Sequence, residues 1–154
     1  MDNKTKAERS ANMRAIRSND TAPELMVRKL LFAEGFRYRL HVKSLPGKPD
    51  IVLPKWKAVI FVNGCFWHVH QNCKRAVRPK SNTAYWEEKL VRNQERDRNE
   101  YDLLKKAGWR VLIIWECACR KGFQSALRSR INHFLQGQDG YGFMEIGPKD
   151  LENT

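Results

Sequence analysis

The stretch that decides the fold is "PDIVLPKWKAVIFVNGCFWHVHQNC", residues 49–73. Its first half contains two short segments that favour β-strands, "PDIVL" and "KAVIFV". A third such segment, "FRYRLHV", lies upstream, on the other side of the turn-forming "SLPGK". Short β-favouring runs separated by glycine and proline turns are typical of consecutive antiparallel strands. We therefore expect an antiparallel meander, which leads into a second half dense in cysteine and histidine.

The segment before this meander carries the signature of a helix start. In "TAPE", Thr21 can cap the helix while Glu24 reaches back to the Thr21 amide. This pattern predicts a helix from about Ala22 to Ala33, ended by Gly35.

The segments after residue 83 predict two more helices with a strand between them. Residues 84–107 lack proline and glycine and carry apolar groups at helical spacing, up to Gly108. "WRVLIIW", residues 109–115, predicts a buried strand, and "FQSALRSRINHFL" predicts a final helix. The order α-β-β-β-α-β-α predicts one α/β domain over residues 21–137, with a mixed central sheet flanked by helices. We expect residues 138–154 to form an irregular tail.

The charge of the chain points to a polyanionic partner. Its 154 residues include 29 Lys and Arg against 17 Asp and Glu, a formal net charge of +12. Neutralising phosphates is the commonest use of such an excess, so we expect nucleic acid as the partner. Residues 1–20 predict a basic arm that orders on a duplex, with Arg14 among its cations and Met13 and Ile16 as its large apolar side chains.

The sequence favours a cytoplasmic protein without a membrane span. No apolar run approaches the roughly 20 residues of a membrane helix, and the N-terminus lacks the apolar core of a signal peptide. In a reducing compartment the four cysteines are better interpreted as thiols or metal ligands than as disulfides.

A compact group of cysteine and histidine predicts a structural zinc site. Cys65, His70 and Cys73 form a C-x4-H-x2-C pattern, close enough for one tetrahedral ion. A fourth ligand must come from elsewhere, and both Cys117 and Cys119 follow the predicted buried strand. The alternative is buried thiols with incidental histidines, because free cysteine packs as a small hydrophobe.

Two residues suggest hydrolytic chemistry beside this group. If His70 binds zinc, His68 is not needed as a ligand. A neutral imidazole can take a proton from water near pH 7, so His68 is a candidate catalytic base. The two histidines could also have the opposite roles. Asp50 opens a strand after Gly-Lys-Pro, as in the first half of the P-D…(D/E)-x-K pattern of metal-dependent nucleases. The second half is missing, because "VIFV" offers neither a carboxylate nor a lysine.

Large aromatic side chains and one polar helix face leave alternatives open. Phe66 and Trp67 can fill the core or wedge between base pairs from a rigid loop, and Trp86 has the same ambiguity. The inward face of the long helix passes through Asn93 and Asp97. Either the middle of this helix overhangs the core, or its inner face borders a polar site.

Six motifs together resemble the very short patch repair (Vsr) DNA mismatch endonuclease family, in order and across roughly residues 10–120. They are "NMRAI", "SLPGKPDIV", "VIFVNGCFWHVHQNC", "YWEEK", "ERDR" and "GWRVLIIWECA". The resemblance implies a variant of the restriction-endonuclease fold that nicks one strand on the 5′ side of the thymine in a T:G mismatch. Such mismatches arise when 5-methylcytosine deaminates.

The resemblance also implies roles for residues near Asp50. Asp50 matches the Mg²⁺-binding aspartate, and Val62 matches the residue whose main-chain carbonyl binds the same ion. His68 matches the histidine that acts on the attacking water, in place of the missing lysine. Glu24 and Asn93 match further polar groups near that site.

The resemblance assigns the zinc ligands and the aromatic side chains as well. The implied zinc ligands are Cys65, His70, Cys73 and Cys117, which selects Cys117 over Cys119. The implied wedge beside the mismatch is Phe66, Trp67 and Trp86, with Met13 and Ile16 in an arm that enters from the opposite groove.

The sequence departs from the family pattern at two places. Asn63 stands where the best-known members have a second active-site histidine, and we expect it to contact the DNA there. In the zinc loop, Val69 and Gln71 replace histidines and Asn72 is an insertion.

The expected substrate is double-stranded DNA with a T:G mismatch, cut by a chain that is monomeric on DNA. The family relation implies contact with general mismatch-repair proteins and a functional link to a cytosine-5 DNA methyltransferase. Two alternatives remain: a related restriction-type or junction nuclease, and a zinc-stabilised DNA-binding module without catalysis.

Overall fold

A five-stranded mixed sheet forms the centre of the protein, which a computed structural model describes over residues 20–137 and 142–152. The strand order is β1-β2-β3-β4-β5. The strands are β1 (Arg39–Leu40), β2 (Ile51–Leu53), β3 (Ala58–Asn63), β4 (Arg110–Trp115) and β5 (Phe143–Ile146). β1, β2 and β3 pair antiparallel, which confirms the predicted meander, whereas β3, β4 and β5 pair parallel.

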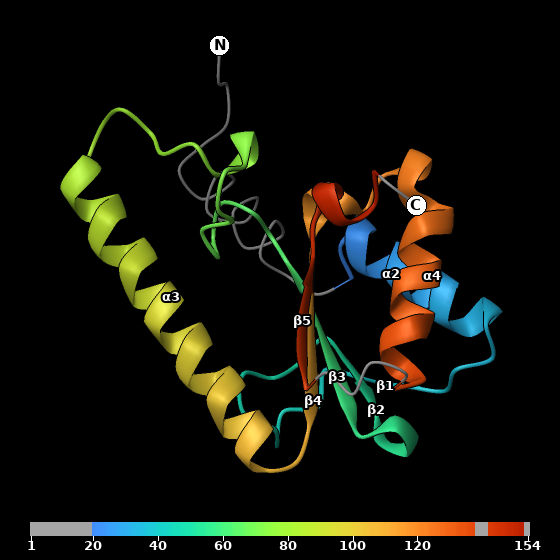
Figure 1. The fold of residues 1–154 in the computed structure, drawn as a ribbon. Coiled ribbons are helices and arrows are strands. Elements are labelled where there is room, and N and C mark those ends of the chain that lie inside the picture. Colours follow the sequence, from blue (N-terminus) through green and yellow to red (C-terminus); the bar gives the residue numbers. More distant parts are fainter. Residues whose placement is uncertain (1–19, 138–141, 153–154) are drawn as a thin grey trace.

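The helices cover both faces of this sheet. Figure 1 shows α2 (Ala22–Ala33) and α4 (Gln124–Leu135) together on one face, and α3 (Thr83–Lys106) on the other. Side chains alternate along the strands: Ile60 and Ile114 pack toward α2 and α4, while Phe61 and Ile113 belong to the second core, on the face that α3 covers. The mixed α/β architecture and the order of elements agree with the prediction.

The prediction of an irregular tail after residue 138 is wrong for Phe143–Ile146. This segment is β5, a parallel edge strand beside β4, and Ile146 is buried in the core. The segment "FMEI" has no long apolar run of its own, so local pattern did not reveal it. β4 is buried along nearly its whole length and is paired on both edges, by β3 and by β5.

The start of α2 differs from the predicted capping box in one contact. The Glu24 amide donates to the Thr21 hydroxyl oxygen at 3.4 Å, as predicted. The Glu24 carboxylate accepts from the Asp20 amide at 3.1 Å, rather than from that of Thr21. Asp20 has a φ of 68°, in the left-handed region, so the chain turns sharply before the helix and Asp20 lies beside Glu24.

One edge of the sheet collects the residues of interest. Because β2 runs antiparallel to β3 and β4 parallel to it, the start of β2 lies beside the ends of β3 and β4. Asp50 precedes β2, Asn63 ends β3, and Asn63 pairs with Trp115 at the end of β4. Within the described ranges, no helix combines the length and the apolar character that a bilayer span requires.

Candidate active site and metal centre

Asp50 is held at the sheet edge by the main chain of β3. Its carboxylate accepts a hydrogen bond from the Val62 amide at 2.8 Å. Burial and the nearby Glu24 carboxylate raise the pKa of Asp50 to about 7. A buried carboxyl group next to a second carboxylate favours a bound proton or a bound cation, as is common at functional sites.

His68 lies in the turn after β3 and is paired with a carboxylate of α3. Its Nδ1 is 2.6 Å from Oδ2 of Asp97, whose side chain is largely buried. Because an ionised carboxylate can only accept, Nδ1 carries the hydrogen. In the neutral imidazole this leaves Nε2 as a proton acceptor, so the pair has the orientation of a histidine base with its orienting aspartate.

The polar inner face of α3 therefore borders a site, and the interpretation as an overhanging helix is wrong. Asn93, one turn before Asp97, donates from its side-chain amide to the Trp67 carbonyl at 3.1 Å. The helical pattern of the sequence placed Asp97 on this face but indicated no role for it. Its position one turn after Asn93, on the same helix face, is the signal that could have found the pair with His68.

The four predicted zinc ligands come together beside the turn after β3, which also carries His68. Ligand atoms of Cys65, His70, Cys73 and Cys117 all lie within 4.8 Å of one another. Cys117 Sγ is 3.4 Å from His70 Nδ1, and the His70 ring stacks on Trp115 with centroids 4.2 Å apart. Burial raises the pKa of both the Cys65 and the Cys117 thiols, so thiolates here require a compensating positive charge.

Cys119 is separate from this group. Its sulfur contacts the Trp115 carbonyl oxygen at 3.8 Å, and burial raises its pKa to about 12. A thiol with that pKa is neutral at physiological pH. The structure thus brings Cys117 to the cluster and leaves Cys119 as a packed side chain.

The tight turn explains how two histidines separated by one residue reach different partners. The His68 amide donates to the Gly64 carbonyl at 3.2 Å, and the His70 amide donates to the Cys65 carbonyl at 2.9 Å. Val69, between the two histidines, has a φ of 56°, which is strained for a β-branched residue. This reversal directs His68 toward α3 and His70 toward the cysteines.

The aromatic side chains form a surface group outside the two cores. Ring centroids lie 5.1 Å apart for Phe66 and Trp67, 5.4 Å for Phe66 and Trp86, and 5.9 Å for Trp67 and Trp86. All three side chains are partly exposed, and within residues 20–137 and 142–152 none belongs to either core cluster. The Lys89 ammonium lies 5.6 Å from the Trp67 ring centroid. The interpretation of these residues as core does not hold.

Asn63 does not fit the predicted role of a direct DNA contact. Its side chain is 3% exposed, and its amide nitrogen donates to the Tyr101 hydroxyl at 2.9 Å. Tyr101 follows Asp97 by one helical turn, so the amide braces the sheet against α3. The other predicted DNA contacts of the arm, Met13, Arg14 and Ile16, lie outside the described residues.

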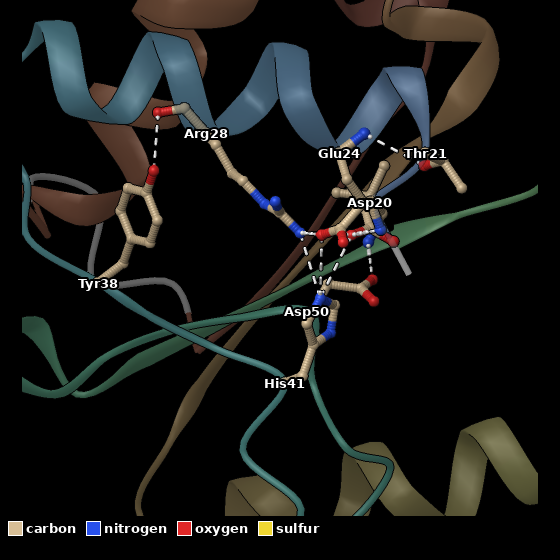
Figure 2. A network of polar contacts seen from close by, with 8 residues as sticks. Asp20, Thr21, Glu24, Arg28, Tyr38, His41 and Asp50 are labelled. Atoms are coloured by element: carbon tan, nitrogen blue, oxygen red, sulfur yellow. Dashed lines mark hydrogen bonds and ion pairs between the residues drawn. The ribbon is translucent and has the colours of Figure 1, made fainter. Parts of the chain in front are cut away.

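Glu24, predicted near the active site, belongs to a further charged network (Figure 2). It is 4% exposed, and its carboxylate is 3.0 Å from Nη2 of Arg28. Arg28 and His41, which also belong to this network, were not predicted from the sequence. The spacing of four residues between Glu24 and Arg28 was a usable signal for an ion pair on α2, whereas His41 offered none.

A cavity with a volume of about 880 Å³ lies between α3, the loop after β3 and the C-terminal strand β5. His68 and Asp97 line it, but Asp50 and Glu24 do not. The cavity therefore adjoins the His68–Asp97 side of the site and not the Asp50 side.

One edge of the sheet thus carries three groups: the buried Asp50 carboxyl group, the His68–Asp97 pair and the cluster of three cysteines and one histidine. These groups place the protein in the class of α/β proteins that could catalyse hydrolysis and bind metal. Comparison with known proteins narrows this class. The family model of DNA mismatch endonuclease Vsr matches residues 1–75.

Three relatives match most of the chain. Type II nicking enzyme V.NmeAIP of Neisseria meningitidis is 45% identical over 132 residues, covering 86% of this chain and 92% of the relative. DNA mismatch endonuclease Vsr of Escherichia coli is 45% identical over 136 residues, covering 86% of each chain. Type II nicking enzyme V.XorIIP of Xanthomonas oryzae is 44% identical over 123 residues, covering 80% of this chain and 88% of the relative. The chain belongs to the Vsr family of DNA mismatch endonucleases.

The raised pKa of Asp50 predicts a pH dependence of stability in the absence of Mg²⁺. The folded-state pKa of about 7 exceeds the ordinary value of 3.8, so the folded state binds this proton more tightly than the unfolded state. The stabilising contribution is full below about pH 4 and is lost as pH rises to about 7. Between pH 5 and pH 8 the wild type should lose about 3 kcal/mol more unfolding free energy than Asp50→Asn.

Denaturant unfolding of both proteins, in buffer without Mg²⁺ or chelator, measures this difference. The Asn side chain has similar shape and does not titrate, so it is the matched control. Parallel stability curves for the two proteins would contradict the buried, protonated state of Asp50.

Proposed function

We propose that this protein is a Mg²⁺-dependent endonuclease that nicks one DNA strand 5′ to the thymine of a T:G mismatch and so starts very short patch repair. The observation that carries the proposal is the presence of Asp50 and the His68–Asp97 pair on one sheet edge. His68 lies close enough to lower the pKa of Asp50 electrostatically. A non-catalytic DNA-binding module has no use for such a pair.

The oxygen ligands at this edge suit Mg²⁺. The Asp50 carboxylate and the Val62 main-chain carbonyl are hard donors, and Mg²⁺ usually takes one or two protein oxygens together with water and phosphate. When bound, the ion would supply Lewis-acid stabilisation of charge at the scissile phosphate. Burial of Asp50 favours this, because a cation compensates the charge that the surroundings disfavour.

His68 would manage the proton in the reaction. Nε2 of the neutral ring accepts a proton of the attacking water, and the water oxygen bonds to phosphorus. The opposite P–O bond breaks, and the leaving sugar oxygen takes a proton from solvent, which gives one phosphomonoester end and one hydroxyl end. Asp97 fixes the tautomer and orientation of the ring through Nδ1 and stabilises its charged form. The protein would thus be a variant of the restriction-endonuclease-like PD-(D/E)xK core in which this pair replaces the lysine.

The cluster of Cys65, His70, Cys73 and Cys117 would hold a structural Zn²⁺ ion. Four protein ligands complete a tetrahedral shell and leave no open position for catalysis. The ion would fix the loop that carries His68 toward α3 and the wedge of Phe66, Trp67 and Trp86 toward DNA. This is a structural role in placing the reactive groups.

The wedge supplies a reason for mismatch selectivity. Inserting aromatic side chains unstacks base pairs, and this costs less at a mismatch than at a paired step. A net charge of +12 provides the affinity for the phosphate backbone that does not depend on sequence.

We infer that the protein acts as a monomer on chromosomal DNA in the cytoplasm. It would be functionally linked to a cytosine-5 methyltransferase and would contact general mismatch-repair proteins.

The proposed activity is tested by strand-specific nicking of a duplex with one T:G mismatch. We expect Mg²⁺-dependent nicking 5′ to the thymine by the wild type and a loss of at least about 10²-fold for Asp50→Asn, because the metal ligand is weakened. Matched and branched duplexes of the same sequence distinguish a restriction-type or junction nuclease. Equal nicking rates for the wild type and Asp50→Asn in Mg²⁺ would refute the role of Asp50.

Two matched variants should distinguish the roles of His68 and His70. His68→Ala should keep the full zinc content and cooperative unfolding but nick about 10²-fold or more slowly, because general-base help is lost. His70→Ala should lose zinc and cooperative unfolding, because a structural zinc ligand contributes directly to folding. If zinc content falls in His68→Ala and not in His70→Ala, the assigned roles are reversed.

A further inference from the structure

The guanidinium group of Arg28 lies at the centre of three potential metal ligands beside Asp50 (Figure 2). Its Nη2 is 2.5 Å from Oδ1 of Asp20, 3.0 Å from Oε2 of Glu24 and 3.2 Å from Nε2 of His41. Ligand atoms of Asp20, Glu24 and His41 all lie within 4.8 Å of one another. Two carboxylates and an imidazole at this spacing can hold a divalent cation, but a cation from α2 already contacts all three.

The contact with Arg28 indicates which ring nitrogen of His41 accepts a hydrogen bond. A guanidinium nitrogen can only donate hydrogen bonds, so Nε2 of His41 must accept and carries a free electron pair. This is the form of imidazole that binds metal ions. The Nε2 electron pair of His41 therefore faces the Arg28 guanidinium.

The backbone on both sides keeps this arrangement in position. The His41 amide donates to the Asp50 carbonyl at 3.2 Å, which ties the imidazole to the residue that opens β2. His41 has a φ of 49° in the left-handed region, which non-glycine residues usually avoid. The Arg28 side chain is only 11% exposed, and its buried Nε has no hydrogen-bond partner among residues 20–137 and 142–152.

We propose that Arg28 is an internal cation that occupies the place of a second metal ion beside Asp50. It neutralises Glu24 and Asp20 and holds the Glu24 carboxylate in place, so that this part of the site takes one divalent ion, at Asp50. Arg28 is a positioning residue in this arrangement and does not contact the reacting atoms. The proposal rests on the proposed function only for the ion at Asp50.

Counting Mn²⁺ ions bound by the zinc-loaded full-length protein, from the electron paramagnetic resonance signal of free Mn²⁺, tests this proposal. Arg28→Met removes the charge and keeps an unbranched side chain, so it should bind one more Mn²⁺ per chain than the wild type. Arg28→Lys supplies another cation and should bind the same number as the wild type. Arg39→Met removes an exposed charge of β1 and should leave the count unchanged.

A second variant identifies the ligands of the added ion. Arg28→Met combined with His41→Ala should return the count to that of the wild type. The same number of ions in Arg28→Met as in the wild type, or an added ion that persists in the double variant, would overturn the proposal.

A folding defect in Arg28→Met also gives a defined result. If Arg28→Met is unfolded without Mn²⁺, recovery of cooperative unfolding on adding Mn²⁺ supports the proposal equally, because the ion replaces the lost charge. Failure of both Arg28→Met and Arg28→Gln to fold at saturating Mn²⁺ contradicts it. The count needs no DNA, so it succeeds or fails independently of mismatch nicking.

Discussion

The parallel pairing of β3 with β4 is the constraint on which the site depends. Asn63 pairs with Trp115 at the last position of the two strands. Cys65 and Cys117 each follow the end of their strand by two residues, so both cysteines lie side by side at the same sheet edge. The turn after Cys65 reverses direction and returns His70 and Cys73 to these two sulfur atoms. Strand register thus joins ligands that are far apart in the sequence.

α3 forms the second wall of the site through three contacts at intervals of one helical turn. Asn93 bonds to the Trp67 carbonyl, Asp97 to the His68 ring and Tyr101 to the Asn63 amide. Side chains four residues apart lie on one face of a helix, so a single straight element fixes successive parts of the loop and the strand end. This explains why a helix with few buried apolar side chains is held at a fixed distance from the sheet.

Features with a local signal could be predicted from the sequence, and features set by long-range pairing could not. The bounds of α2 agree with the prediction because Thr21 and Gly35 mark its ends chemically. β5 was not predicted, because "FMEI" becomes a strand only through pairing with β4. For the site, the compact spacing of the cysteines and histidines predicted a metal cluster. Only the family resemblance assigned His70 to the zinc and His68 to catalysis, and selected Cys117 as the fourth ligand. The network around Arg28 and His41 arises from contacts between α2 and the segment after β1, which no local pattern encodes.

The central claim is that Cys65, His70, Cys73 and Cys117 hold one zinc ion, which keeps His68 free for the sheet edge at Asp50. The most direct measurement is X-ray absorption at the zinc edge on the purified full-length protein. We predict one zinc per chain with three sulfur ligands at about 2.3 Å and one nitrogen ligand at about 2.0 Å. A shell with two nitrogen ligands would mean that both histidines bind the ion, and this result, or the absence of bound zinc, would contradict the account.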